Sequence, residues 1–273
     1  MRRSIPIALR QLVMVAMAVV SLYPIWFLLQ TALKTNEQYT LSPTGLPSHP
    51  TLENLRQVIL ELPVPRWALN SAIVTVLSVS ISTVIALLAA YAIVFSTMRF
   101  REALLRVNLG LMVIPPVALL IPMFVFMVDA GLINSLASVV IFYSGLMVPF
   151  AVFFFVNFFR QFPVELIDAA TVDGASPLTT LRRVVLPISK AATFTLVIVN
   201  AIWVWNELLI ALVFLQDENR RTLMAGLTLF QGRYATNEPL VLAGALVSIL
   251  PVILVYVAGQ RFFMRGLTAG IGK

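Results

Sequence analysis

The sequence predicts an all-α membrane protein with six transmembrane helices and both termini in the cytoplasm. Hydrophobic residues make up 60% of the 273 residues and charged residues only 11%, against about 25% in a soluble domain. Six apolar runs reach the roughly 20 residues that a helix needs to cross a bilayer core. No linker-like stretch divides the chain, so we expect a single transmembrane domain over residues 1–273.

The first apolar run has to be distinguished from a signal peptide, because MRRSIPIALR precedes it. The run continues to Leu33, well beyond the roughly 7–15 residues of a signal-peptide core. We therefore interpret it as an uncleaved transmembrane helix. The six predicted spans are residues 12–33, 72–95, 107–128, 136–159, 191–215 and 240–259.

Several of these spans contain prolines. The third contains Pro115, Pro116 and Pro122, the fourth Pro149 and the sixth Pro251. Proline inside a membrane helix frees a backbone carbonyl and tends to kink the axis. We therefore expect bends at these positions.

Lysine and arginine set the predicted orientation, because cytoplasmic loops of membrane proteins are enriched in them. If the N-terminus is cytoplasmic, 13 of the 19 Lys and Arg residues lie on the cytoplasmic side. The net charge of +7 is then explained by a basic cytoplasmic face, and no nucleic-acid partner is expected. The same orientation places the connection between the fourth and fifth spans in the cytoplasm.

The chain has no cysteine and one histidine, His49, in a proline-rich loop, and this argues against most catalytic and metal sites. Disulfides, Cys-ligated zinc and iron–sulfur clusters are excluded. Ser–His catalysis and multi-His metal sites are disfavoured. We therefore expect no catalytic residues and no metal site.

A polar segment, PVELIDAATVDGASPLTTLRRVVLPIS, occupies residues 163–189 between the fourth and fifth spans. Pro163 is suited to begin a helix, where its missing N–H costs nothing. Asp173-Gly174 is expected to end that helix, since glycine accepts positive φ, and Ser176-Pro177 to begin a second one. Pro187 is expected to end the second helix where the chain re-enters the membrane.

Each of the two predicted helices has an apolar and a charged face. The acids Glu165 and Asp168 belong to the first helix, whereas Arg182-Arg183 belongs to the second. A helix that binds lipid headgroups should be basic throughout, so this division favours a protein partner over lipid contact alone. The predicted apolar faces are Val164, Ile167 and Thr171 in the first helix and Leu178, Leu181 and Val185 in the second.

The segment resembles the EAA motif of bacterial ATP-binding cassette (ABC) import permeases. That motif reads Glu-Ala-Ala, three residues, Gly, nine residues and Ile-x-Leu-Pro. Here Asp168-Ala169-Ala170 is followed by Gly174 and then by Val184-Val185-Leu186-Pro187, so the spacing is complete. Asp168 stands in place of Glu and Val184 in place of Ile, and the shorter Asp side chain has less reach.

The resemblance implies the type I ABC importer permease fold, with a cytoplasmic coupling loop at about residues 160–190 that a separate ATPase subunit moves. The residues that it implicates in ATPase coupling are Glu165, Asp168, Ala169, Ala170, Asp173, Gly174, Ala175, Leu186 and Pro187.

Further motifs resemble the carbohydrate branch of that family, typified by the smaller membrane subunit of the maltose importer. They are Asn70-Ser71, Ala89-Ala90-Tyr91-Ala92, Gly131-Leu132-Ile133-Asn134, Trp205-Asn206-Glu207 and the tail from Gln260 onward.

Glycines predict that the cytoplasmic tail, residues 260–273, is too flexible to form a stable helix alone. The resemblance implies that it contacts the ATPase pair through Gln260, Arg261, Gly266 and Gly270.

The chain has no P-loop, which requires Gly-Lys-Ser/Thr, because only Lys273, the last residue, follows a glycine. We therefore expect no enzyme activity and no cofactor on this chain, with ATP and Mg on the partner ATPase. The resemblance implies three further components: a second homologous permease in a heterodimer, an ATPase dimer and an extracytoplasmic substrate-binding protein. It implies a multi-pass protein of the bacterial inner membrane, in contact with lipid.

Four polar or aromatic residues in the fifth span are candidates for a substrate pathway: Asn200, Trp203, Asn206 and Glu207. Ionisable groups in a bilayer are costly and usually face a cavity or partner. Glu207 lies 17 residues, or about 25 Å of helix, beyond Lys190. That places it close to the outer boundary, where a structural or gating role is favoured over ligand binding.

Several functions remain open on the sequence alone. The leading hypothesis is a sugar permease, and a permease for glycerol phosphate, a polyol or another polar solute is the alternative in the same importer class. A secondary transporter should have internal repeats and relay charges in its helices, and Glu207 gives it little support. An ion channel would need a selectivity filter before the sixth span, which QDENRR does not resemble.

Overall fold

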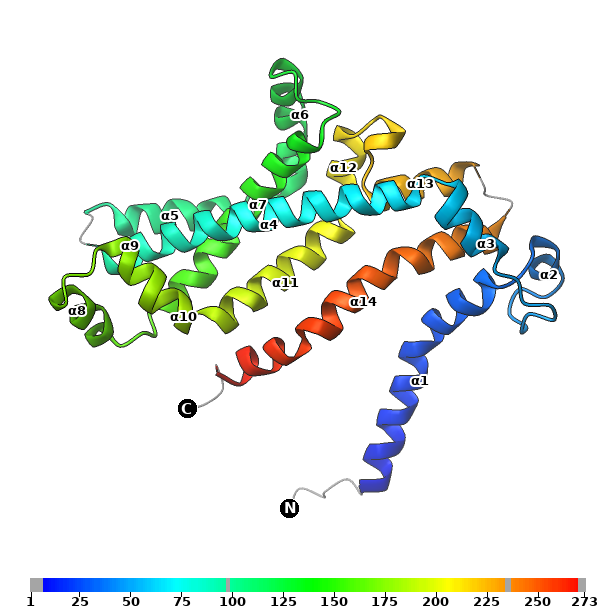
Figure 1. The fold of residues 1–273 in the computed structure, drawn as a ribbon, viewed down its shortest axis with the longest axis horizontal. Helices are drawn as coiled ribbons and strands as arrows, with labels where there is room; N and C mark the ends of the chain where they lie inside the picture. The colour runs from blue at the N-terminus through cyan, green and yellow to red at the C-terminus, as the bar shows by residue number, and fades with distance from the viewer. Residues whose placement is uncertain (1–6, 97–98, 234–236, 270–273) are drawn as a thin grey trace. The chain divides into compact units, whose positions relative to one another are not determined.

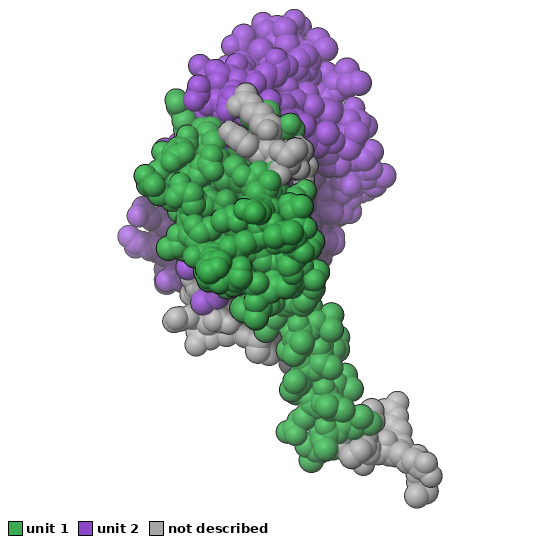
Figure 2. Space-filling model, turned by 90° about the vertical axis from the view of Figure 1, so that its right-hand side faces the viewer, with its two compact units in different colours: residues 1–66, 226–251 green, residues 67–225, 252–273 purple. Residues whose placement is uncertain are grey.

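The computed structural model describes residues 7–96, 99–233 and 237–269, and within these ranges all regular structure is helical (Figure 1). Contacts divide the chain into two compact units, which Figure 2 distinguishes by colour. Unit 1 comprises residues 1–66 and 226–251, and unit 2 comprises residues 67–225 and 252–273.

Unit 1 contains the first long helix, the loop that follows it and the start of the last helix. Its elements are α1 (Ile7–Ala32), α2 (Asn36–Leu41), α3 (Glu53–Arg56), the π-helical turn η1 (Gln57–Glu61), most of α13 (Leu223–Arg233) and the first part of α14 (Glu238–Ala269).

The loop after α1 is organised around Lys34, whose side chain is almost fully buried. Its Nζ donates hydrogen bonds of 2.9 Å to the carbonyl oxygens of Ser42 and Pro43. Asn54 Nδ2 donates to the carbonyl oxygens of Ala32 (2.9 Å) and Lys34 (2.7 Å), which the end of α1 leaves without helical partners. Burial lowers the pKa of the Lys34 ammonium below its usual range.

Unit 2 contains the remaining helices. They are α4 (Val64–Phe95), α5 (Arg101–Leu111), the 3₁₀ turn η2 (Pro116–Leu119), α6 (Leu120–Asp129), α7 (Leu136–Phe159), α8 (Val164–Val172), α9 (Pro177–Thr180), the π-helical turn η3 (Leu181–Val185), α10 (Leu186–Ile188), α11 (Lys190–Asn206), α12 (Leu209–Phe214) and the 3₁₀ turn η4 (Glu218–Arg220). Helices α8, α9 and α10 lie at one end of α11, and α12 lies at the other (Figure 1).

Among the described residues, four helical stretches are long and apolar enough to cross a membrane: Ile7–Ala32, Val64–Phe95, Leu136–Phe159 and Glu238–Val257. They correspond to the first, second, fourth and sixth predicted spans. The count reaches six if two bent helix pairs are each taken as one span. These pairs are Arg101–Leu111 with Pro116–Asp129, and Pro177–Ile188 with Lys190–Asn206.

The bend predicted at the prolines of the third span, residues 107–128, is confirmed, and it interrupts the helix. Helix α5 ends at Leu111, and the chain bends by 93° before Pro116–Asp129. Pro115 has ψ 137°, which is extended backbone. The reason is steric, because a residue that precedes a proline is driven out of the helical region, and Pro116 also lacks the N–H that a continuing helix needs.

The prediction that Glu207 lies within the helix of the fifth span, residues 191–215, is wrong. Helix α11 ends at Asn206, Glu207 has an extended ψ of 128°, and the short helix α12 begins at Leu209. At Pro149 and Pro251, where bends were also predicted, helices α7 and α14 continue without interruption.

The tail is not a separate segment up to residue 269, because the backbone of α14 is helical through Ala269. Extending an existing helix adds one hydrogen bond per residue and avoids the cost of nucleation. A single internal glycine such as Gly266 costs only about 1 kcal/mol against alanine. The remaining tail residues, 270–273, lie outside the described residues.

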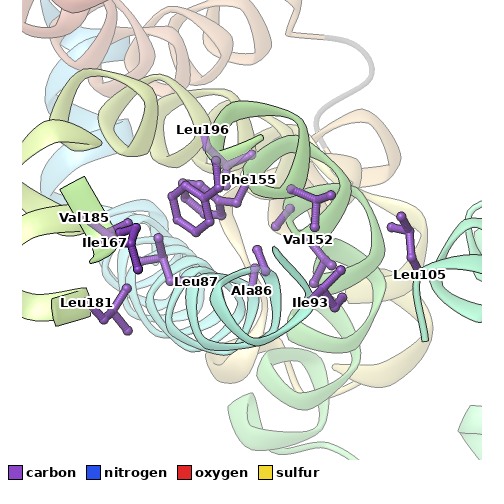
Figure 3. Packing of buried hydrophobic residues seen from close by; sticks show 14 residues of the cluster. Ala86, Leu87, Ile93, Leu105, Val152, Phe155, Ile167, Leu181, Val185 and Leu196 are labelled. Carbon is purple, nitrogen blue, oxygen red and sulfur yellow. The ribbon is translucent and has the colours of Figure 1, made fainter. Parts of the chain in front are cut away.

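Two apolar clusters in unit 2 position the polar segments. The first joins α4 and α7 to the segment between the fourth and fifth spans: Ala86, Leu87, Val152 and Phe155 share it with Ile167, Leu181 and Val185 (Figure 3). The second contains Phe142, Tyr143 and Met147 of α7 together with Val204 of α11 and Ile210 and Phe214 of α12. Each cluster therefore fixes one end of α11.

Candidate functional site

The segment Pro163–Ser189, which we call the knob, forms two short helical pieces around a tight turn, as predicted. Pro163 precedes α8, and Gly174 has a φ of +75° after its end. The N–H of Ala175 donates to the carbonyl of Ala170 (2.9 Å), which closes the turn. Ser176 caps α9 by accepting from the N–H of Thr179 at 3.3 Å, and Pro177 occupies the first turn of that helix.

The predicted buried faces of the knob are only partly right. Ile167 and Ala170 are the buried residues of α8, whereas Val164 and Thr171 are exposed. In the second piece, Leu181 and Val185 are buried as predicted, but Leu178 is 66% exposed. Thr180 is buried instead. Its hydroxyl donates to the carbonyl oxygen of Ser176 at 3.2 Å, so the buried polar group has a partner.

The second helical piece of the knob does not end at Pro187, which corrects another expectation. Helix α10 runs from Leu186 to Ile188, and Pro187 sits in its first turn, where a proline is tolerated. The axis then turns by 79° between Pro177–Ile188 and Lys190–Asn206. Ser189 lies at the corner, is buried, and donates from its hydroxyl to the carbonyl of Val185 at 2.6 Å.

The surface of the knob combines acidic and apolar side chains. The acids are Glu165, Asp168 and Asp173, and all three are exposed. Of the other residues in the motif, Ala169 and Pro187 are exposed, Ala175 and Leu186 are half-buried, and Ala170 is buried. Exposed large apolar residues lie among them: Val164, Leu166, Val172 and Leu178.

The candidate pathway residues of α11 have different surroundings. Asn200 is buried, and its Nδ2 has no hydrogen-bond partner among the described residues. Trp203 is 40% exposed and packs edge-on against Tyr143, with ring centroids 5.7 Å apart. Asn206 is exposed, and its Nδ2 donates to the carbonyl of Ile202 in its own helix at 2.7 Å.

Glu207 occupies the break between α11 and α12, where several donors surround its carboxylate. The hydroxyl of Tyr143, from α7, donates to Oε2. The N–H groups of Ile210 (3.1 Å) and Ala211 (3.3 Å), in the first turn of α12, donate to the same carboxylate. Sequence reasoning singled out Glu207 but missed Tyr143, since no local signal distinguishes this tyrosine from its apolar neighbours.

Two of the remaining motifs, Asn70-Ser71 and Gly131-Leu132-Ile133-Asn134, meet on the chain that follows α12. Asn70 Nδ2 donates to the carbonyls of Asn219 (3.0 Å) and Arg221 (2.9 Å), and Ser71 Oγ accepts from the N–H of Leu223 (2.8 Å). Asn134, with a φ of +59°, accepts at Oδ1 from the N–H of Asp217 at 2.9 Å. Residues 217–223 are thus held by the start of α4 and by the α6–α7 loop.

A cavity of about 450 Å³ lies between the bent α5–α6 pair and α7. Its lining is made of apolar side chains with Gly145 and two prolines. It therefore lacks the side-chain hydrogen-bonding groups that a polar solute requires.

Gln260, Arg261 and Gly266 belong to the helical backbone of α14, and Gly270 lies outside the described residues.

Comparison with known proteins gives consistent matches along the chain. Residues 82–267 match the family model described as "Binding-protein-dependent transport system inner membrane component". The chain is 34% identical over 250 residues to the sulfoquinovosyl glycerol transport system permease protein SmoH of Agrobacterium fabrum, covering 91% of this chain and 88% of that protein. It is 31% identical over 251 residues to the melibiose/raffinose/stachyose import permease protein MelC of Bacillus subtilis, covering 92% and 91%.

Among solved structures, a chain of a bacterial ABC transporter involved in the import of the acidic polysaccharide alginate superposes with a TM-score of 0.82. The sequences are 26% identical, and the match covers 94% of this chain and 95% of that chain.

Proposed function

Because this chain belongs to the family of inner membrane components of binding-protein-dependent transport systems, we propose that it is the permease subunit of a sugar importer. In this proposal it forms the translocation pathway together with a second homologous permease, in a type I ABC importer fold. Residues 1–273 act as one permease domain. Support for a sugar comes from the relatives, whose names specify a sulfoquinovosyl glycerol and the sugars melibiose, raffinose and stachyose.

The observation that carries the proposal is the surface of the knob. A folded segment with exposed acids and five exposed large apolar side chains, Ile188 included, suits a protein partner, since covering apolar area is favourable. We propose that an ATPase subunit covers it. We assign the contacts with the ATPase to Glu165, Asp168, Ala169, Asp173, Gly174, Ala175, Leu186 and Pro187. Ala170 is buried and therefore makes no contact with the ATPase in this proposal.

The mechanism we propose is alternating access. ATP and Mg bind to the ATPase dimer, whose closure moves the knob, and the membrane helices respond by exposing the pathway to the outside. An extracytoplasmic binding protein delivers the solute there. Both termini and the knob lie in the cytoplasm in this proposal, in accord with the distribution of Lys and Arg. The tail after residue 260 also contacts the ATPases.

The test is transport by the complete importer in proteoliposomes, measured over a panel of sugars, polyols and glycerol phosphates with and without ATP. Uptake of a sugar that requires ATP and the ATPase subunits would support the proposal. Uptake restricted to glycerol phosphate or a polyol would retain the importer and replace the substrate class. Uptake by this chain alone, driven by an ion gradient, would instead identify a secondary transporter.

A further inference from the structure

The carboxylate of Glu207 ties together two helices that the sequence places far apart. Tyr143 is only 1% exposed and reaches the carboxylate from α7, and the Trp203 ring packs against Tyr143 edge-on. The first-turn N–H groups of α12 donate to the same carboxylate. The Glu207 carboxylate therefore accepts hydrogen bonds from both α7 and α12. The backbone of the same residue forms the break after α11.

Helix α11 connects this carboxylate to the knob. It begins at Lys190, immediately after the 79° turn that follows the knob, and its 17 residues end at Asn206. At 1.5 Å per residue the helix is about 25 Å long. The knob and α12 lie at its opposite ends (Figure 1). A displacement of the knob is therefore delivered along α11 to the chain break at Glu207.

What happens at that break decides whether the displacement continues. The backbone there is extended, with ψ 128° at Glu207, so no helical hydrogen bonds carry α11 into α12. An unrestrained break absorbs movement by changing its dihedral angles, as hinges do. The hydrogen bonds of the carboxylate remove this freedom, because α12 cannot swing without breaking charge-assisted bonds.

We propose that Tyr143 and Glu207 form a latch that makes α7, α11 and α12 move as one body, so that displacement of the knob reaches α12. This inference rests on the proposed function, and it assigns the two residues a positioning role in coupling with no contact to the solute. Asn157 of α7 is the matched control, since it is exposed, is not among the candidate pathway residues, and donates from Nδ2 to the carbonyl of Phe153 in its own helix at 2.8 Å.

The test compares complete importers carrying wild-type chain, Glu207→Gln, Tyr143→Phe, both changes together, or the control Asn157→Ala, which should keep the wild-type ratio. The readout is the number of solute molecules transported per ATP hydrolysed in proteoliposomes with matched subunit content. We expect each single change in the latch to lower this ratio at least about 5-fold while ATP hydrolysis continues. The double variant should lose no more than the more severe single variant, because both changes act on the same hydrogen bond: Gln removes the charge of its acceptor and Phe removes its donor.

Losses that multiply in the double variant, or unchanged ratios in both single variants, would overturn the latch. If Glu207→Gln fails to assemble, Tyr143→Phe removes only one oxygen atom and can be followed by a spin label on Leu209→Cys, an exposed position in α12. The label should change mobility on nucleotide binding in wild-type chain and not in Tyr143→Phe. A wild-type complex without ATP-driven transport would contradict the proposed function itself. A wild-type complex that transports with ATP, together with latch variants that transport as many solute molecules per ATP, would contradict the latch alone.

Discussion

Leu178 offers the sharpest test of the knob as a docking surface. Its side chain is 66% exposed at the start of the second helical piece, although the sequence pattern predicts it on the buried face. Ser176 and Pro177 begin the helix without it. Leu178→Ala therefore removes apolar surface from the proposed interface and leaves the fold of the knob intact.

The expected magnitude follows from the exposed area. Complete burial of a leucine side chain contributes about 1.5–3 kcal/mol. Because two-thirds of the side chain remains to be covered by a partner, truncation to alanine should cost about 1–2 kcal/mol of binding free energy. That corresponds to an increase in Kd of about 5- to 30-fold, since each 1.4 kcal/mol is a factor of ten.

The assay is a titration of purified ATPase subunit onto the permease pair in lipid nanodiscs. Leu46→Ala is the matched control, because Leu46 is 71% exposed in the loop between α2 and α3, which the proposed topology places on the opposite side of the membrane. The control should bind with wild-type affinity. Equal Kd values for Leu178→Ala, the control and wild type would refute the assignment of Leu178 to the interface.

Four further predictions concern other parts of the chain. Gly174→Val should abolish recovery of the ATPase with the purified permease while membrane insertion stays normal, since its φ of +75° is strained by about 1–2 kcal/mol or more for a β-branched residue; full recovery would contradict this. Asp168→Lys reverses a charge at the proposed interface and should likewise reduce ATPase recovery and transport, and wild-type values for both would exclude an acidic contact. Lys34→Met leaves two carbonyl oxygens without their donor, at about 1–3 kcal/mol, and should speed amide hydrogen exchange in residues 36–54 with no change in residues 164–188. Deleting residues 266–273 should preserve assembly and lower substrate-stimulated ATP hydrolysis, and an unchanged stimulation ratio would remove the tail from the mechanism.

Local signals were sufficient to predict the architecture of the knob. Pro163, Gly174 and Ser176 act through their own backbone or the nearest N–H groups, so their effects can be inferred without the rest of the chain. The faces of its helices were less predictable. Periodicity identifies residues that share a face, but the surface provided by α4 and α7 decides which face is buried, and Thr180 is buried in place of Leu178.

The breaks in the third and fifth spans show a different limit. Two prolines indicated a bend near residue 115, but the 93° angle depends on packing against α7 and its neighbours. At Glu207 the sequence showed a charge in an apolar run and favoured a structural role. The partner that makes this role specific, Tyr143, lies 64 residues away, and only the tertiary structure brings the two side chains together.

The most direct measurement of the central claim is cross-linking from a single cysteine in the knob, which is feasible because the chain contains no cysteine. Thr179→Cys should cross-link to the ATPase subunit and should resist an impermeant reagent added outside intact cells. Gly232→Cys, an exposed site with room for a side chain, should show the reverse. Labelling of Thr179→Cys from outside, without a cross-link to the ATPase, would contradict the account, because the knob would then lie on the wrong side of the membrane to receive the energy of ATP hydrolysis.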